Sequence, residues 1–362
     1  MSVTPTTTPD VAPDVISSPQ TEPLVTIVVV PRERFSCAQR SLESIYAHTT
    51  LPFKLVYVDG NSPRHVHRYL AEQAERRHFQ LIRTAHYLTP NQARNLGLSY
   101  VQTKYVVFAD NDVIVSDHWL EALVNCAEET GADIVGPLMC QEEPVHEIIH
   151  FAGGESHIWV DNTGRRRLRE KMYKQGKRVA EVRDQLQRTP TELAEFHCVL
   201  VRTEVFQQVG SLDERMLNTK EHLDFCMTVA QRGGKIYFEP ASIVTYVPGP
   251  PLQWSDLPFY MLRWSDAWTL NSLYRLRDKW NLAEDGYFQN RYKKANWRRI
   301  MTIISPFVHR VTFGRYSKIL ETILVHIERP LNRFLTDRHA QQSKSLNAKP
   351  TDSAPPTALP QS

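Results

Sequence analysis

The chain has 362 residues, of which 41% are hydrophobic, so it is long enough to bury at least one substantial core. Its 43 lysine and arginine residues and 40 acidic residues leave a net charge of +3, which is too small to indicate a nucleic-acid-binding protein. The five cysteines lack the CxxC spacing of a zinc site, and we expect them to be buried, reduced thiols.

Neither a membrane span nor a secretory leader is predicted from the sequence. No apolar stretch approaches the roughly 20 residues that a membrane-spanning helix requires. The first residues lack the basic start and apolar core of a signal peptide. We therefore expect a cytoplasmic protein, with peripheral attachment to the inner face of a membrane left open. Residues 1–23 and 341–362 are poor in large apolar groups, which predicts disordered tails.

Strands and helices alternate in the first half of the chain. Apolar runs predict strands, and stretches with apolar residues on one side predict helices. In chain order we expect strands at 24–30, 54–59, 79–83, 105–110 and 133–138, and helices at 38–48, from 63, at 91–101 and after Asp117. Ser62 is predicted to cap the second helix, with Pro63 as its first residue. This order indicates an α/β fold with a mainly parallel twisted sheet flanked by helices.

The second half is mixed. Residues 163–191 are strongly basic, which favours a solvated helix; the alternative is a mobile flap whose cations meet a phosphate or an anionic lipid. Further strands are predicted at 196–201, 235–238 and 242–247, and residues 251–340 read as a helical, basic and aromatic extension. Within the extension, residues 293–308 combine cations with an apolar face. This pattern fits an amphipathic helix on an anionic membrane and equally a helix packed on the preceding domain.

The fourth predicted strand ends in two carboxylates, Asp110 and Asp112, separated by one residue. In an extended chain both point the same way, at the carboxyl end of the strand, where ligands of open α/β sheets bind. Two hard oxygen donors suit a divalent cation such as Mn²⁺ or Mg²⁺, which can in turn hold a diphosphate. The alternative is that Asp-Asn-Asp only forms a turn.

Several short motifs follow one another in a recognisable order. The apolar first strand, the segment from Val56 to Ser62 and the helix from Asn91 to Gly97 precede the acidic strand, and the motifs Val209 to Glu214, Glu221 to Cys226 and Gly233 to Pro240 follow it. In this order they resemble the family 2 glycosyltransferases, which use nucleotide sugars and have the GT-A fold. The resemblance covers residues 24–250, and it likens Asp110 and Asp112 to the D-x-D motif of that family.

The resemblance implies a donor site and a metal site. Asp59, together with the turn from Pro31 to Glu33, would bind the base of a nucleoside diphosphate sugar, first of all a UDP-sugar. Arg94 would lie near the base or the diphosphate, Asp110 near the ribose and the metal, and Asp112 would bind the metal directly. Asp59 could instead be a turn residue, and Arg94 an exposed side chain on its helix.

The resemblance also places an acidic cluster on the acceptor side, where inverting members keep their base. A base must lie near the attacking hydroxyl, and Glu221 and Asp224 share one face if a helix begins there. His222 stands where the family commonly has aspartate, so we rank Glu221 first, Asp224 second and His222 third. Asp224 could instead stabilise the helix dipole.

A second departure from the family pattern is Tyr246, which stands where many members have a metal-binding histidine. A phenol is a poor ligand, so the metal would be held more loosely, with water in the gap. We interpret His150 and His197 as packed, hydrogen-bonded residues rather than ligands.

These observations together predict an inverting, metal-dependent, hexosyltransferase-like enzyme. It would move a sugar from a nucleoside diphosphate sugar to a hydroxyl of a glycan or lipid-linked acceptor, in polysaccharide, glycolipid or other glycoconjugate synthesis. Two alternatives are a nucleotidyltransferase, because related sheets bind nucleotides through carboxylate-held magnesium, and a non-catalytic sugar-nucleotide-binding protein.

Overall fold

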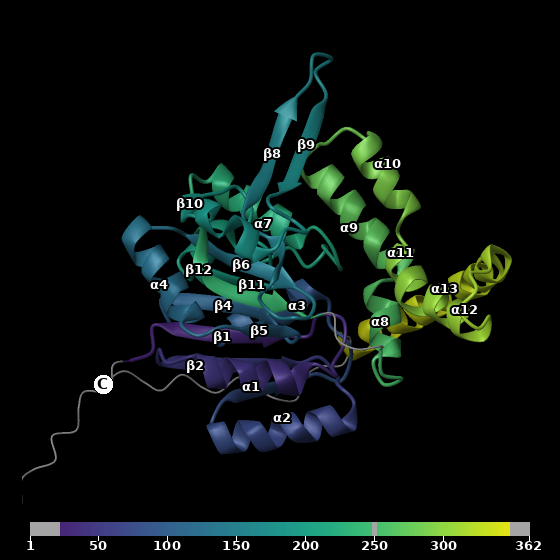
Figure 1. The fold of residues 1–362 in the computed structure, drawn as a ribbon, viewed down its shortest axis with the longest axis horizontal. Coiled ribbons are helices and arrows are strands. Elements are labelled where there is room, and N and C mark those ends of the chain that lie inside the picture. The colour runs from purple at the N-terminus through teal and green to yellow at the C-terminus, as the bar shows by residue number, and fades with distance from the viewer. Residues whose placement is uncertain (1–21, 248–251, 348–362) are drawn as a thin grey trace, which may run out of the picture.

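A ten-stranded sheet forms the centre of the molecule (Figure 1), with strand order β10-β12-β6-β11-β4-β1-β2-β3, β5 beside β12 and β7 beside β6. The computed structural model describes residues 22–247 and 252–347. The strands are β1 (Val25–Val30), β2 (Phe53–Asp59), β3 (Gln80–Arg83), β4 (Tyr105–Asp110), β5 (Val113–Val115), β6 (Ile134–Gln141), β7 (Ile148–Phe151), β10 (Thr189–Pro190), β11 (Cys198–Arg202) and β12 (Ile236–Tyr246). The helices of this part are α1 (Ala38–His48), α2 (Arg64–Arg77), α3 (Pro90–Leu98), α4 (Trp119–Thr130), α5 (Val179–Val182), η1 (Arg183–Gln185), α6 (Val205–Val209) and α7 (Glu221–Gln231).

The predicted α/β class is confirmed, and the first four strands are parallel as expected. β1 pairs in parallel with β2 and β4, and β2 pairs in parallel with β3. β11, however, runs antiparallel to both of its neighbours, β4 and β6, so the whole sheet is mixed. This antiparallel pairing places Cys198 opposite Ala109. It thereby brings His197, the residue before β11, to the acidic end of β4.

Three predicted helix starts are off by one residue. The helix expected at 91–101 is α3, which begins at Pro90 and already ends at Leu98. Pro63 is the N-cap of α2 and keeps an extended backbone with ψ of 150°, and the helix begins at Arg64. Ser62 is therefore not the cap; its backbone N–H donates to Asp59 Oδ1 at 2.7 Å in a turn closed by the aspartate. The N-cap of α4 is His118 rather than Asp117.

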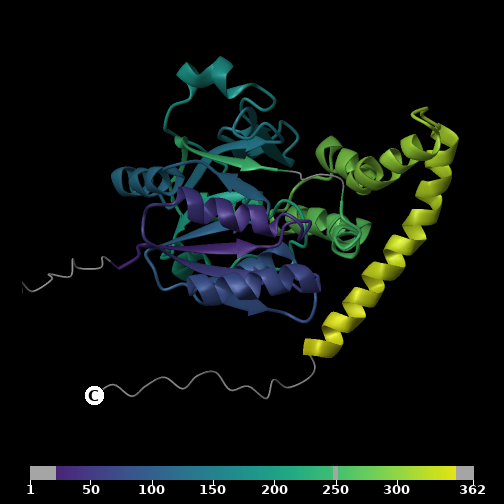
Figure 2. The same cartoon turned by 60° about the horizontal axis from the view of Figure 1, so that its bottom comes forward.

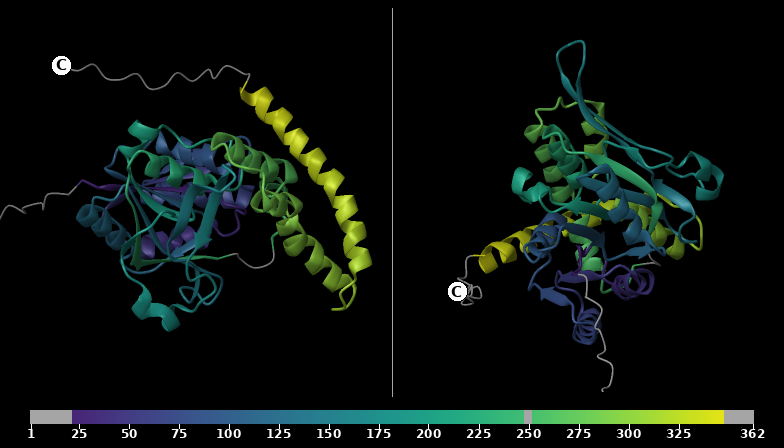
Figure 3. Two further views of the ribbon diagram at one scale, coloured as in Figure 1. Left: turned by 90° about the horizontal axis from the view of Figure 1, so that it is seen from above. Right: turned by 90° about the vertical axis from the view of Figure 1, so that its left-hand side faces the viewer.

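The basic segment is not the helix that its charge favours. Residues Arg166–Met172 form β9, which pairs with β8 (Gly154–Val160) in a two-stranded hairpin. The hairpin projects from the body of the molecule (Figure 3). Alternation along β9 turns Leu168 inward and places Arg169 beside Glu155 of β8 at 2.7 Å. Pairing with carboxylates that are distant in sequence therefore overrides the local charge pattern.

The strand expected at 235–238 and the strand expected at 242–247 are one strand, β12. Its parallel register with β6 shifts between Glu239 and Ile243, which marks a bulge at the position where we expect a break.

The C-terminal region is helical, as predicted. It comprises α8 (Leu257–Arg263), α9 (Asp266–Lys279), α10 (Gly286–Lys293), α11 (Trp297–Arg299), the π-helical turn η2 (Ile300–Ile304), α12 (Ser305–Val311) and α13 (Lys318–Asn347). In Figure 2, α13 is a long helix along the outer side of this region. It continues to Asn347, past residue 341 where we expect a tail to begin. The other residues of the two predicted tails, 1–21 and 348–362, lie outside the described residues.

Membrane crossing by a helix is not supported in the part of the chain that the structure describes. None of its helices combines the length and the apolar composition that a span requires.

Packing of α3 against β1 positions one side of the site. A Cβ at Gly97 would lie 2.3 Å from Cγ1 of Val28, so only glycine permits this close approach of helix and strand. Arg94, almost one turn earlier on α3, is thereby brought against the carboxyl end of the sheet, where its side chain is fully buried.

Candidate active site

The acidic loop after β4 is tied to the turn after β1. Asn111, between the two aspartates, accepts a hydrogen bond from Arg32 N at 3.0 Å and donates to the carbonyl of Arg34 at 2.8 Å. The N–H of Asp110 donates at 2.8 Å to the carbonyl of His197, the residue before β11. Asn111 therefore has a structural role, and it fixes the direction of the carboxylates on either side.

Asp112 is buried without a partner for its side chain. Both carboxylate oxygens lack a hydrogen bond within the described residues, although the backbone carbonyl accepts one from Val247 at 3.1 Å. Burial and the nearby carboxylates of Asp110 and Glu33 raise the pKa of Asp112 well above its ordinary value. Buried polar groups are nearly always paired, so this carboxylate is placed to meet a cation or another ligand.

Asp110, in contrast, is surrounded by cations. Arg94 Nη2 donates to Oδ1 at 3.0 Å, and Arg32 Nε lies 3.5 Å from Oδ2. Burial raises the pKa of Asp110 even against the arginines. Arg94 also donates to the carbonyl of Phe196 at 3.3 Å and lies 4.5 Å from the centre of that ring. The alternative that Arg94 is an exposed helix side chain is therefore wrong.

His197 lies within the acidic cluster, which the sequence interpretation misses. Its Nδ1 is 3.1 Å from Asp110 Oδ2, and one donor atom from each of His197, Asp110 and Asp112 lies within 4.8 Å of the others. Burial and Arg32 lower the pKa of His197 well below its ordinary value, so the imidazole is neutral and keeps a lone pair. His150 is a packed residue as expected, with Nδ1 2.9 Å from Gln141 Oε1.

These three side chains fit a divalent metal ion. Two carboxylates and one neutral imidazole form a donor set that Mn²⁺ or Mg²⁺ accepts. Both carboxylate oxygens of Asp112 are buried without a hydrogen-bond partner among the described residues, and this is an independent observation in favour of a bound cation. His197 offers a nitrogen donor at this cluster, whereas the phenol of Tyr246 donates to Glu33 Oε1 at 2.8 Å.

Glu221, the first-ranked candidate base, lies beside two of the arginines at this cluster. It opens α7 and is buried, with Oε1 3.7 Å from Arg94 Nη1 and 3.8 Å from Arg263 Nη2. Its Oε2 has no partner in the described chain. Burial opposes ionisation, but Arg263 and Arg94 outweigh it and lower the pKa of Glu221. The group is thus an ionised carboxylate with a free oxygen.

The other two candidate bases have different neighbours. Asp224 accepts hydrogen bonds from Lys279 Nζ at 2.7 Å and Trp280 Nε1 at 2.8 Å, both at the end of α9. The Nε2 atom of His222 lies 3.5 Å from Glu195 Oε1 and has no hydrogen bond in the described chain. Asp224 therefore ties α7 to the C-terminal helices, which is a structural role.

Of the residues expected to bind the donor base, Asp59 and Glu33 already have hydrogen-bond partners within the protein. Asp59 accepts from Ser62 N, from His67 Nδ1 at 3.0 Å and from Arg83. Pro31 adjoins the same loop, since a Cβ on Gly60 would lie 3.1 Å from its Cγ.

Glu33 joins the turn after β1 to the C-terminal helices. Besides Tyr246, it accepts from Trp264 Nε1 at 2.9 Å and lies 3.8 Å from Arg298. Although burial opposes it, Arg298 and Arg32 help to lower the pKa of Glu33 to about 2.

Arg263 completes the site from the extension, and the sequence analysis misses it. Its Nε donates to the carbonyl of Arg32 at 2.9 Å, its Nη1 donates to the carbonyl of Asn218, and its Nη2 is buried without a hydrogen bond in the described residues. Burial and Arg32 lower the pKa of Arg263 to about 9. A single arginine in the apolar, aromatic run of α8 is the signal that could reveal it.

The sheet edge can therefore hold an anion. Arg32, Arg94 and Arg263 surround Asp110 and Glu221, and the unpartnered atoms of Asp112, Glu221 and Arg263 all lie in this region. Guanidinium groups match phosphate oxygens in geometry and charge. A diphosphate with its metal ion would satisfy both the cations and the carboxylates.

Comparison with known proteins identifies one family. The sequence model of the family described as "Glycosyl transferase family 2" matches residues 26–210, about half of the chain. The pre-mycofactocin glycosyltransferase of Mycobacterium tuberculosis is 23% identical over 224 residues, which cover 61% of this chain and 42% of that protein. The match therefore spans about two fifths of the length of these curated relatives.

Two solved structures resemble the chain with TM-scores just below 0.5. A crystal structure of GalNAc-T7 with UDP, GalNAc and Mn²⁺ has a TM-score of 0.48 and 16% identity, covering 77% of this chain and 55% of that one. The mannosyltransferase PcManGT from Pyrobaculum calidifontis, in complex with GDP-Man and Mn²⁺, has a TM-score of 0.47 and 13% identity, covering 90% and 87%.

Proposed function

Because the chain belongs to glycosyl transferase family 2, we propose that it is an inverting, metal-dependent glycosyltransferase that moves a sugar from a nucleoside diphosphate sugar to an acceptor hydroxyl. The observation that carries this proposal is the unpartnered, buried carboxylate of Asp112 beside Asp110 and His197. Mn²⁺ or Mg²⁺ would be held by these three residues, where it would neutralise charge on the diphosphate.

Glu221 is the proposed base. Its free Oε2 accepts the proton of the acceptor hydroxyl as the acceptor oxygen bonds to the anomeric carbon. The bond between that carbon and the phosphate oxygen breaks, and the electron pair leaves with the nucleoside diphosphate. Arg94 and Arg263, both buried and both near Glu221, stabilise the negative charge that develops on the leaving group.

The donor and the acceptor are proposed as chemical classes. A UDP-sugar is the first donor to test, with Asp59 and the turn from Pro31 to Glu33 nearest to its base. Because the carboxylates of Asp59 and Glu33 are engaged, the turn's backbone and Arg32 are the groups left to contact the nucleotide. The acceptor is a hydroxyl of a glycan or a lipid-linked glycoconjugate.

A membrane surface is the proposed location of the reaction. Large apolar side chains are exposed on α13, among them Ile319, Ile327 and Phe334. Lys318, Arg329 and Arg333 lie on the same helix without an ion pair to any described residue. Exposed apolar groups flanked by cations are typical of helices that lie on anionic lipid at the inner face of a membrane.

A product assay tests the proposed reaction. The full chain is incubated with UDP- or GDP-sugars, glycan or lipid-linked acceptors, and Mn²⁺ or Mg²⁺. Release of nucleoside diphosphate is expected only with metal, together with a product whose anomeric configuration is the reverse of the donor's. Release of pyrophosphate from nucleoside triphosphates would make the chain a nucleotidyltransferase. If calorimetry shows that sugar nucleotides bind but no acceptor is glycosylated, the chain would be a non-catalytic sugar-nucleotide-binding protein.

A further inference from the structure

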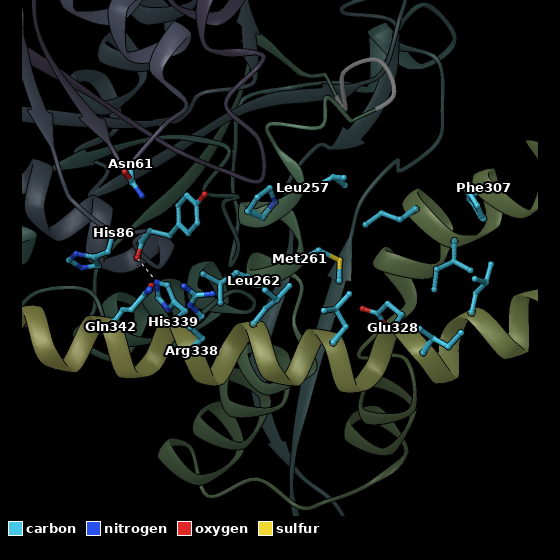
Figure 4. A pocket seen from close by; sticks show the side chains of 18 of the residues that line it. Asn61, His86, Leu257, Met261, Leu262, Phe307, Glu328, Arg338, His339 and Gln342 are labelled. Carbon is cyan, nitrogen blue, oxygen red and sulfur yellow. Dashed lines mark hydrogen bonds between the residues drawn. The ribbon is translucent and has the colours of Figure 1, made fainter.

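A cavity of about 880 Å³ lies between α13 and the rest of the molecule, apart from the acidic cluster. Its walls are α13, α8, the turn η2 with α12, and the loop after β3 (Figure 4). This volume is typical of sites for small molecules. None of the proposed catalytic or metal-binding residues lines it.

Polarity is segregated along the cavity. Phe307 lies at one end, whereas His86, Arg338 and His339 gather at the other end (Figure 4). The lining also includes apolar residues such as Ile303 and Leu324. From Leu324 to Gln342 the wall formed by α13 is roughly 27 Å long, at about 1.5 Å per residue. The cavity therefore has the shape and polarity of a long hydrocarbon chain with a polar head.

The polar end is cationic. Arg338 is exposed and has no hydrogen bond or ion pair within the described ranges. His339 is held in place by Tyr87, whose carbonyl lies 3.1 Å from Nε2. The acidic residue of the lining, Glu328, is neutralised by Arg299, whose Nε donates to it at 2.6 Å. An anionic head would thus meet an unpaired guanidinium and no free carboxylate.

The cavity opens onto the apolar stripe of α13. Ile319, Ile323, Ile327, Leu331 and Phe334 are all exposed at helical spacing. Ile327 and Leu331 belong to this stripe and also line the cavity. A chain could therefore pass from an apolar surface, such as the proposed membrane, directly into the cavity.

We propose that this cavity binds one membrane amphiphile, with its hydrocarbon chain between α13 and α8 and its phosphate head at Arg338 and His86. Charge complementarity at the polar end and continuity with the exposed stripe select this occupant. The inference goes beyond the proposed glycosyl transfer and does not rest on it, because binding is measured without donor or turnover.

The test is calorimetric titration of the full chain with dodecyl phosphate below its micelle concentration. One molecule is expected to bind per chain, at least about tenfold more tightly than octyl phosphate, since each buried methylene favours binding. Inorganic phosphate alone is expected not to compete at equal concentration. Equal affinity for the two chain lengths, or full competition by inorganic phosphate, would overturn the proposal.

Two matched pairs of variants locate the site. Leu331 and Ile323 are each 51% exposed on α13, but only Leu331 lines the cavity. We expect Leu331→Gln to weaken dodecyl phosphate binding about fivefold or more, and Ile323→Gln to leave it unchanged. Arg338→Ala is expected to weaken dodecyl phosphate about fivefold, and Arg333→Ala less than twofold.

A variant that fills the cavity provides an independent test if Leu331→Gln or Arg338→Ala destabilises the chain. Ala85 is an exposed lining residue, and Ala85→Trp should block uptake while the melting temperature stays unchanged. Equal weakening by Leu331→Gln and Ile323→Gln would show adsorption to the helix surface and overturn the proposal. So would dimerisation that Leu331→Gln abolishes without any uptake of dodecyl phosphate, since a second copy would then cover this face.

Discussion

Arginines and carboxylates gather in two places, the β8–β9 hairpin and the edge of the sheet, and they are paired to different degrees. In the hairpin, the carboxylate of Glu170 accepts hydrogen bonds from Lys220 at 2.6 Å, Tyr287 at 2.6 Å and Arg291 at 2.9 Å. At the sheet edge, Asp112 receives no hydrogen bond from any described side chain, and one oxygen of Glu221 is equally unpartnered.

The difference separates charges that hold the fold from charges that await a ligand. A buried carboxylate surrounded by donors stabilises the folded chain, whereas a buried carboxylate without donors costs stability until something binds. Sites that lower stability are retained where function needs them. Substitutions in the two places should therefore have opposite effects on stability and activity, which makes the comparison testable.

The largest effect is expected from Asp112→Asn. Loss of the proposed metal ligand should lower glycosyl transfer about 10³-fold or more, since a metal ion contributes several kcal/mol to stabilising the transition state. The melting temperature should stay the same or rise, because an unpartnered buried carboxylate with a raised pKa is removed. Nucleoside diphosphate release and thermal unfolding measure the two. Full activity would remove Asp112 from the mechanism.

Glu221→Gln tests the second unpartnered carboxylate. Transfer should fall about 10²-fold or more, because the amide cannot accept the proton of the acceptor hydroxyl. The donor affinity, measured by calorimetry, should change little. A loss of donor affinity equal to the loss of rate would instead give Glu221 a binding role.

Glu170→Gln should act on stability and leave the rate per folded molecule unchanged. Against the cost of burial, Lys220 and its other partners lower the pKa of Glu170 to about 2 from 4.5. A depressed carboxyl pKa contributes stability above pH 4.5 that is lost as the pH falls towards 2, here about 3 kcal/mol.

Denaturant unfolding at pH 7 and near pH 3 measures this contribution. The variant should be less stable than the parent at pH 7, and the gap should narrow in acid. A gap that does not depend on pH would show that the pairs around Glu170 contribute nothing through its charge.

The smallest expected effect is a change in activation by metal that distinguishes His197 from its neighbour His150. Their ring centres are 5.6 Å apart. His197→Ala should weaken activation by Mn²⁺ about tenfold or more, since it removes a proposed ligand. His150→Ala, the matched control, should change it less than threefold. Metal titrations of nucleoside diphosphate release give both values, and equal shifts would argue against His197 as a ligand.

Local sequence patterns predict most of the first half of the fold. The boundaries of α1 agree with the prediction, and the alternation of apolar strands and helices correctly predicts β1 to β4. Asp110 and Asp112 were identifiable because their spacing and their place after a buried strand are local features. The motif order also leads to the correct family.

The misses depend on contacts between segments that are distant in the chain. His197 meets Asp110 only because β11 pairs antiparallel with β4, and a single sequence does not contain that register. Arg263 reaches Glu221 from the extension. The basic run forms a strand rather than the predicted helix, because Arg169 pairs with Glu155 on the strand before it. Tertiary pairing decided each of these cases.

The bonds of Glu33 and Asp224 to the C-terminal helices have a consequence for cooperativity. Trp264 donates to Glu33 and Trp280 donates to Asp224, so separation of the helices from the sheet would break a hydrogen bond to each carboxylate, although Glu33 would keep the phenol of Tyr246. Removing a donor from a buried carboxylate lowers stability. We therefore expect a single calorimetric unfolding transition for the sheet and the C-terminal helices, and a chain cut near residue 250 would be a poor substitute for the whole.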